Sequence, residues 1–233
     1  MKSQLRIATM VVLTTLCLAS AAVPALAGIK NLYDNGQPND DTTAWTINFG
    51  YAVSNSFGLN NDSTITGFQY EIWAIPGDKQ LSVDWTISSQ QGGAGAVFGS
   101  GTATVGGNGL QGTLASQFVS SNAYGYEIDL ETVTGLSMPV NKSGSPTDYW
   151  LTLQNATDSQ LAPVYWDENS GEGCGGADGH GLYCSSLAWS DSAGTIPSEA
   201  FTVNGQTPEP SSFLLLGSGI LGLAGLVRKR FFG

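Results

Sequence analysis

The chain has very little positive charge and very few sulfur or imidazole side chains. Only 8 of its 233 residues are Lys or Arg, 3 are Cys and 1 is His, against 19 Asp and Glu. Zinc is therefore disfavoured, because zinc sites use several Cys or His ligands. Residues 28–207 hold three lysines and 18 carboxylates, a formal charge of −15. Nucleic acid and anionic lipid surfaces would repel such a body, so we exclude both as partners.

Familiar catalytic motifs are lacking too. The sequence has neither a Gly-x-Ser-x-Gly elbow nor a His-Glu-x-x-His helix, and its one histidine, His180, lies in a glycine-rich stretch. Glu127, Asp129 and Glu131 alternate along one predicted strand, with neighbours about 6.5–7 Å apart, a spacing found among glycosidase carboxyl pairs. We expect these carboxylates to face water, where nothing would raise the pKa of a general acid. The sequence therefore predicts a protein that is not an enzyme.

The N-terminal segment has the pattern of an export signal. Lys2 and Arg6 precede an apolar stretch, and Ala25-Leu26-Ala27 supplies the small-x-small pattern that signal peptidase accepts. We predict a signal peptide over residues 1–27, cleaved between Ala27 and Gly28. A first membrane helix is the alternative.

The C-terminal segment, 208–233, combines three unlike elements in order. Pro208-Glu209-Pro210 is followed by an uncharged run from Phe213 to Val227 and then by Arg228-Lys229-Arg230. The run is short and is interrupted by glycines, at Gly217, Gly219, Gly222 and Gly225. As a helix it would cover roughly 22 Å of a hydrocarbon layer about 30 Å thick. We predict a C-terminal hydrophobic helix that is inserted transiently before processing, with a permanent tail anchor as the alternative.

These C-terminal elements resemble the PEP-CTERM sorting signal of bacterial envelope proteins. The resemblance rests on Thr207-Pro208-Glu209-Pro210-Ser211, the apolar run and the basic tail. It implies that an exosortase, a membrane transpeptidase-like enzyme, recognises the signal after signal peptidase has acted. The sorting residues would be Pro208, Glu209, Pro210, Arg228, Lys229 and Arg230. The implied destination is the cell envelope, the cell surface or an extracellular matrix, where the body would associate with exopolysaccharide.

The body between these segments, residues 28–207, alternates apolar and polar side chains. The pattern runs from Trp45 to Val53, from Phe68 to Ala74, from Leu81 to Ile87 and from Tyr149 to Leu153. No stretch of this body keeps an apolar stripe of period 3.6 over three turns. The alternation predicts an all-β body, an antiparallel β-sandwich of jelly-roll type with about eight to ten strands. An open barrel is the alternative.

Parts of the body also resemble the choice-of-anchor group of secreted bacterial domains, type R. The matching segments are Asn31-Leu32-Tyr33-Asp34-Asn35-Gly36, Asp84-Trp85-Thr86-Ile87-Ser88, Tyr149-Trp150-Leu151-Thr152-Leu153-Gln154-Asn155, Pro163-Val164-Tyr165-Trp166-Asp167-Glu168-Asn169 and Ile196-Pro197-Ser198-Glu199-Ala200-Phe201. The resemblance implies a surface role and carries no active site.

One acidic, glycine-rich segment, from Tyr165 to Gly181, is the candidate for an ion site. Its hard oxygen ligands would be Asp167, Glu168, Asn169, Glu172 and Asp178, which suit Ca²⁺. A solvated loop without an ion is the alternative, and no other cofactor is predicted. Cys174 and Cys184 form an even pair in an exported chain, and we predict a disulfide between them.

Exposed aromatic rings are the remaining candidate for ligand binding. Trp150 and Trp166 lie out of phase with, or at the end of, their apolar strand patterns. A flat ring of this kind would stack on a sugar, which gives an alternative function, a carbohydrate-binding module assisted by calcium. The competing interpretation is that both tryptophans fill the core.

Overall fold

The computed structural model describes residues 30–38, 43–107, 111–142, 149–169 and 187–207. This part of the chain is built almost entirely of β-strands, with one 3-10 turn, η1 (Gln91–Gly93). The strands are β1 (Lys30–Asp34), β2 (Ala44–Thr46), β3 (Ala52–Phe57), β4 (Ser63–Ala74), β5 (Gln80–Ser88), β6 (Val97–Val105), β7 (Thr113–Ser121), β8 (Glu127–Val140), β9 (Tyr149–Asp158), β10 (Tyr165–Asp167), β11 (Ala188–Ser190), β12 (Gly194–Ile196) and β13 (Phe201–Gln206). The predicted all-β class is confirmed.

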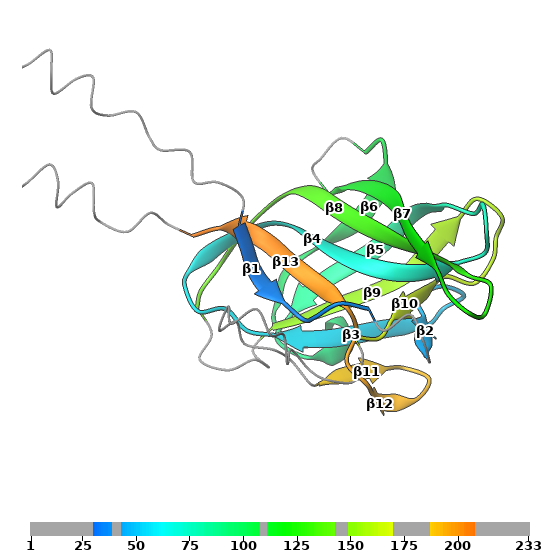
Figure 1. Ribbon diagram of the computed structural model, residues 1–233. Coiled ribbons are helices and arrows are strands. Elements are labelled where there is room, and N and C mark those ends of the chain that lie inside the picture. Colours follow the sequence, from blue (N-terminus) through cyan, green and yellow to red (C-terminus); the bar gives the residue numbers. More distant parts are fainter. Residues whose placement is uncertain (1–29, 39–42, 108–110, 143–148, 170–186, 208–233) are drawn as a thin grey trace, which may run out of the picture.

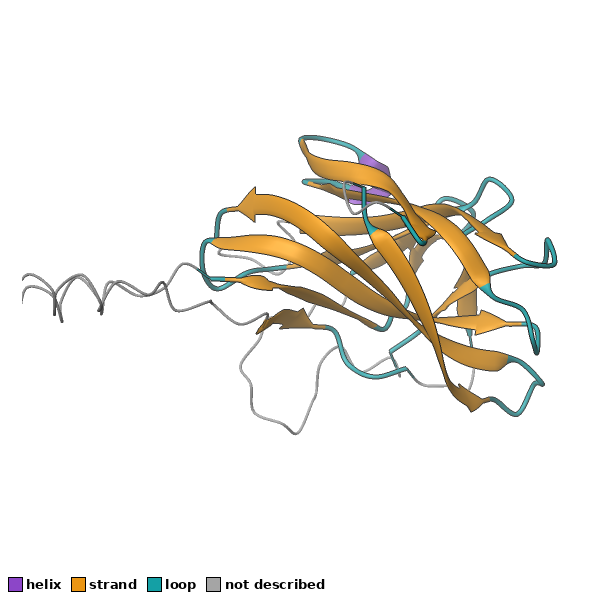
Figure 2. Cartoon of the chain, turned by 90° about the horizontal axis from the view of Figure 1, so that it is seen from above, coloured by secondary structure: helices purple, strands orange, loops and turns teal. Residues whose placement is uncertain are grey.

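Hydrogen bonds join these strands into one 13-stranded sheet that curls on itself and stays open (Figures 1 and 2). Its order is β1-β13-β4-β8-β7-β6-β5-β9-β3-β11-β12, and β10 links β2 to β4. Neighbours are antiparallel except β6 and β7, which pair in parallel over two residue pairs. The described residues therefore form one hydrogen-bonded sheet and not two separate sheets stacked face to face. The predicted sandwich is not confirmed. The predicted C-terminal helix lies outside the described residues.

The hydrophobic core fills the inside of the curl. Its largest fully buried side chains include Trp166, Tyr33, Tyr70, Phe57 and Phe68. The rings meet edge to face: Trp166 and Tyr70 have centroids 6.1 Å apart, and Trp166 and Phe201 5.7 Å apart. Such pairs add about 0.5–1.5 kcal/mol beyond the area they bury. The core therefore depends on aromatic side chains brought together from β1, β3, β4, β10 and β13.

Gly67 in β4 allows a close backbone approach within this sheet. The register between β4 and β8 shifts between Ile65 and Gly67. A Cβ added at Gly67 would lie 2.2 Å from the carbonyl oxygen of Val133, so no larger residue fits without moving a strand. An irregularity of this kind bends a strand, as the curl of the sheet requires.

The alternating run from Trp45 to Val53 is not one strand. It divides into β2 and β3 at a turn in which the amide of Tyr51 donates to the carbonyl of Asn48 at 3.0 Å. Both central residues have positive φ, 56° at Phe49 and 89° at Gly50. The Phe49 side chain is 64% exposed. The prediction of a continuous half-buried strand was wrong because Gly50 allows a turn that the apolar spacing hides.

Candidate functional site

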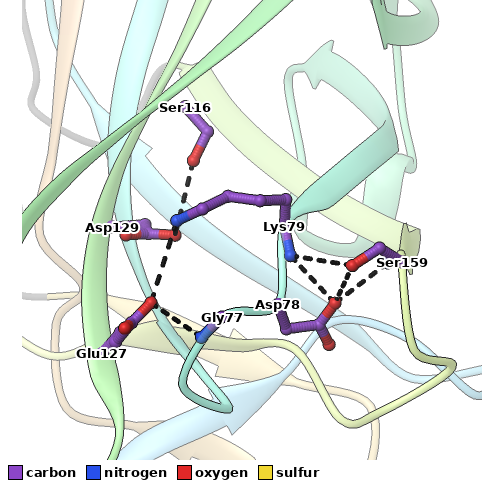
Figure 3. A network of polar contacts seen from close by, with 7 residues as sticks. All are labelled: Gly77, Asp78, Lys79, Ser116, Glu127, Asp129 and Ser159. Atoms are coloured by element: carbon purple, nitrogen blue, oxygen red, sulfur yellow. Dashed lines mark hydrogen bonds and ion pairs between the residues drawn. The ribbon is translucent and has the colours of Figure 1, made fainter.

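A network of charged side chains lies on the inner face of β8, beside the loop that precedes β5 (Figure 3). The ammonium of Lys79 donates to Asp129 Oδ2 at 2.7 Å and lies 3.8 Å from Glu127 Oε2. The Ser116 hydroxyl on β7 donates to the same Asp129 oxygen at 3.4 Å. Asp129 is completely buried, whereas the Lys79 side chain is 46% exposed. The network thus joins a buried carboxylate to a lysine that enters from the rim.

The loop that carries Lys79 is fixed by Asp78 (Figure 3). Asp78 Oδ1 accepts hydrogen bonds from the amide of Lys79 at 2.8 Å, the amide of Ser159 at 3.0 Å and the Ser159 hydroxyl. The amide of Gly77 donates to Glu127 Oε2 at 3.1 Å, which attaches the same loop to β8. These contacts hold the Lys79 backbone between β9 and β8, so the position from which its side chain extends is fixed.

Glu131 lies two residues beyond Asp129 on the same inner face and is also completely buried. Neither of its carboxylate oxygens has a partner of normal hydrogen-bond geometry among the described residues. Burial raises the pKa of Glu131 to about 8, although the nearby Ser116 hydroxyl lowers it, and the charge of Asp129 raises it further. Burial, followed by the charge of Glu131, also raises the pKa of the facing Tyr70. Glu131 therefore changes protonation close to neutral pH.

These positions correct the expected orientation of β8. The sequence predicts that Glu127, Asp129 and Glu131 face water, but Asp129 and Glu131 are buried on the same face as Val133, and Glu127 is partly buried. Alternation divides a strand into two faces without saying which one is inside. Here Lys79 supplies the opposite charge from 50 residues away, and this pairing permits the burial.

A second buried acidic pair lies where the chain of β10 meets the segment before β13. Glu168 and Glu199 face each other in an isolated antiparallel bridge. Glu168 accepts from the Thr43 hydroxyl at 2.8 Å and from the Trp45 indole at 2.9 Å. Glu199 is completely buried, and its oxygens have no hydrogen-bond partner among the described residues. Burial, then the charges of Glu168 and Asp167, raise the pKa of Glu199 well above its ordinary value.

Three of the five predicted calcium ligands fall in this region. Asp167, Glu168 and Asn169 are all buried, and the Asn169 amide donates to the carbonyl of Asn35. The structure therefore shows part of an interior polar cluster in place of the predicted surface loop. The other two predicted ligands, Glu172 and Asp178, lie outside the described residues. Within the described ranges, no group of three or more His, Cys, Asp and Glu is arranged to hold a metal ion, so calcium remains a prediction.

The two candidate sugar-binding tryptophans are buried. Trp166 is completely inaccessible, and its indole donates to the carbonyl of Ala200 at 2.8 Å. Trp150 is only 9% exposed. Neither ring offers a free face to a sugar, so both positions support the core interpretation. The alternating pattern did not reveal that Trp150 is buried, because both faces of β9 are buried over its first five residues.

One exposed aromatic residue was missed by the sequence reasoning. Tyr124 precedes β8 in a turn held by Asn122, is 61% exposed, and stacks on Trp73 with ring centroids 6.0 Å apart. Its neighbours Tyr126 and Tyr165 extend the cluster. No strand pattern marks Tyr124, since it lies in a turn, and only its proximity to glycine (Gly125) pointed to a loop.

The remaining predicted sites lie outside the described residues. They are the signal peptidase site at Ala25, Ala27 and Gly28, the disulfide between Cys174 and Cys184, and the sorting residues Pro208, Glu209, Pro210, Arg228, Lys229 and Arg230. Among the residues that are described, no helix is both long and apolar enough to cross a bilayer.

Comparison with known proteins identifies one segment of the chain. Residues 206–230 match the PEP-CTERM protein-sorting motif. No curated protein matches the chain, and no solved structure does. The matched segment contains the Pro-Glu-Pro signal, the apolar run and the basic tail, so the resemblance drawn from those residues is confirmed. The motif suggests an exported protein that an exosortase system sorts to the cell envelope.

Proposed function

We propose that this chain is an exported, non-enzymatic surface or matrix protein. Its β body would be displayed after sorting by an exosortase and would associate with exopolysaccharide, as a member of the choice-of-anchor group. The observation that carries the proposal is the PEP-CTERM motif at residues 206–230. Signal peptidase would act first, at Ala27 and Gly28, and the C-terminal run would be inserted in the membrane until the exosortase had processed the chain.

Two features of the body support a non-enzymatic role. Asp129 and Glu131, which have the spacing of a glycosidase carboxyl pair, are both completely buried, and a glycosidic bond would have to reach them for catalysis. Lys79 already neutralises Asp129 at 2.7 Å. These carboxylates are best explained as parts of the interior of the sheet.

The sorting proposal can be tested in a bacterial host that carries an exosortase system. Wild-type chain should appear in the envelope or medium, beginning at Gly28 and lacking its basic tail. Replacing Pro208, Glu209 and Pro210 together by alanine should leave the chain in the membrane fraction with the tail intact. A matched body variant, Gln117→Ala at an exposed position of β7, should sort normally. Equal release of the alanine variant and the wild type would refute the proposal.

A second candidate function is carbohydrate binding at the Tyr124 cluster. The exposed Tyr124 ring, backed by Trp73, presents the kind of flat apolar surface that sugars stack on. A glycan array probed with and without EDTA tests both this surface and the predicted calcium. Binding that Tyr124→Ala abolishes would favour this function, and loss of binding in EDTA would favour calcium. An array without any signal in either condition would reject the module.

A further inference from the structure

We propose that Lys79 and Asp129 condense into an intramolecular amide bond, with Glu131 carrying the proton. The two reacting side chains already touch, since Lys79 Nζ lies 2.7 Å from Asp129 Oδ2. Glu127, the other carboxylate near this lysine, is 3.8 Å away. Figure 3 shows the Lys79 side chain extended toward Asp129, with Glu127 below them in this view. The geometry thus selects Asp129 as the partner.

Burial of Asp129 favours condensation over a permanent ion pair. Its carboxylate is completely inaccessible, and Oδ1 has no hydrogen-bond partner among the described residues. The buried carboxylate of an ion pair loses hydration that the attraction of its partner does not always replace, whereas an amide contains no ionised group. Holding the two groups in contact also supplies the effective concentration that free amines and carboxylates lack in water, which reaches about 10⁵–10⁸ M in favourable cases.

The reaction balances without any added reagent. Proton transfer within the ion pair gives the neutral amine of Lys79 and the carboxylic acid of Asp129. The amine nitrogen attacks Cγ of Asp129, so that an N–C bond forms. One C–O bond then breaks, and its oxygen leaves as water with the two protons lost from nitrogen. Glu131 gives one proton to the departing oxygen and takes one from nitrogen, so it ends unchanged.

Glu131 is suited to this role by its position and its surroundings. It lies on the same inner face of β8 as Asp129, and the Ser116 hydroxyl lies close to both carboxyl groups. Among the described residues its oxygens make no hydrogen bond of normal geometry, and the Ser116 hydroxyl is a donor that lies near them, so they can accept or release a proton. Burial first, and then the charge of Asp129, raise the pKa of Glu131 to about 8, which makes both protonation states accessible near neutral pH.

The bond would connect two strands that are not neighbours in the sheet. Lys79 immediately precedes β5, Asp129 belongs to β8, and β6 and β7 lie between these strands in the sheet order. β6 and β7 pair through only two residue pairs. The amide would therefore brace the curled sheet across this short pairing, and it would survive denaturation because it is covalent.

Mass spectrometry of the full chain, purified, reduced and denatured, tests the bond directly. The intact mass should fall short of the sequence mass by one water molecule. Trypsin should no longer cleave after Lys79, so residues 31–142 should appear as one peptide with the same deficit. Lys79→Arg keeps the charge and the cleavage site but cannot form the amide, and it should show the full mass. Lys142→Arg, remote from the network, should keep the deficit.

The outcomes separate the two parts of the proposal. A wild-type chain with the full sequence mass and normal cleavage after Lys79 would overturn the bond, whatever the variants do. Glu131→Gln removes the proton carrier with little change in shape, and it should slow bond formation at least tenfold in a time course after refolding. A deficit that forms in Glu131→Gln at the wild-type rate would overturn the role of Glu131.

Discussion

Replacement of Trp166 tests most directly whether the buried aromatic residues belong to the hydrophobic core or to a ligand-binding site. Its ring packs against Tyr70 and Phe201 and is completely inaccessible. Trp166→Ala should lower the free energy of unfolding by about 3–5 kcal/mol through the lost ring and the cavity. The carbonyl of Ala200 would also lose its donor at 2.8 Å, at about 1–3 kcal/mol for a buried polar group left without its partner. Together these losses approach the whole stability of a small domain, about 5–15 kcal/mol.

Urea denaturation of the body, followed by far-UV circular dichroism, measures this loss. Trp166→Phe is the informative companion, because it keeps an aromatic ring and removes the indole N–H, and it should cost less than the alanine variant. Tyr124→Ala, at an exposed ring, should cost no more than about 1.5 kcal/mol. If Trp166→Ala unfolded at the wild-type urea midpoint while glycan binding was lost, Trp166 would be a ligand platform and the core assignment would be refuted.

Three further predictions concern a buried acid, a turn and a strand contact. The pKa of Glu199 is raised first by burial, so the folded chain keeps a proton that the unfolded chain releases. The contribution of Glu199 to stability is therefore fully present below its pKa in the unfolded chain, and it falls as pH rises toward its pKa in the folded chain. Glu199→Gln should remove this pH dependence, a slope of up to about 1.4 kcal/mol per pH unit in urea titrations. Phe49→Asn should raise the urea midpoint by the equivalent of about 0.5–1 kcal/mol, since Asn-Gly suits a turn with two positive φ values. Gly67→Ala should lower the melting temperature, with about 1–3 kcal/mol lost, because its Cβ would lie 2.2 Å from a backbone oxygen.

Each of these predictions has a clear contrary result. A pH profile of Glu199→Gln parallel to that of the wild type would mean that Glu199 is ionised in the folded chain. A lower urea midpoint for Phe49→Asn would show that the exposed ring contributes packing. An unchanged melting temperature for Gly67→Ala would show that β4 and β8 can separate locally without loss.

The all-β class could be predicted from the sequence because period-two alternation is a local property. The positions of Phe68, Tyr70 and Ile72 on β4 follow directly from it. Whether the strands form one curled sheet or two stacked sheets could not be predicted, because both arrangements place alternate side chains inside. That difference depends on β6 and β7, whose parallel pairing joins the two parts of the sheet through only two residue pairs. No periodicity in the sequence reveals so short a pairing.

The candidate site was harder to predict for a related reason. Asp129 and Glu131 are polar residues in an alternating strand, and the usual inference places such residues outside. The inward position of Asp129 depends on Lys79, which reaches it only because Asp78 and Ser159 fix its loop. The body has only three lysines for 18 carboxylates, so the sequence could have shown that each lysine has several acidic residues with which to pair. The particular partner is a property of the fold.

The burial of carboxylates changes what the acidic composition implies about the surface. The formal charge of −15 treats all 18 carboxylates as ionised and exposed. Glu131 and Glu199 are completely buried and have raised pKa values. Asp129 is also buried and is paired with Lys79, whose charge the value of −15 already includes. Around neutral pH the body therefore carries less negative charge than its composition states, and part of that charge lies inside. Acidic side chains on the inner face need a proton, a lysine or a covalent bond to remain there. The stability of the folded sheet should therefore depend on pH more strongly than that of a sheet with a purely apolar interior.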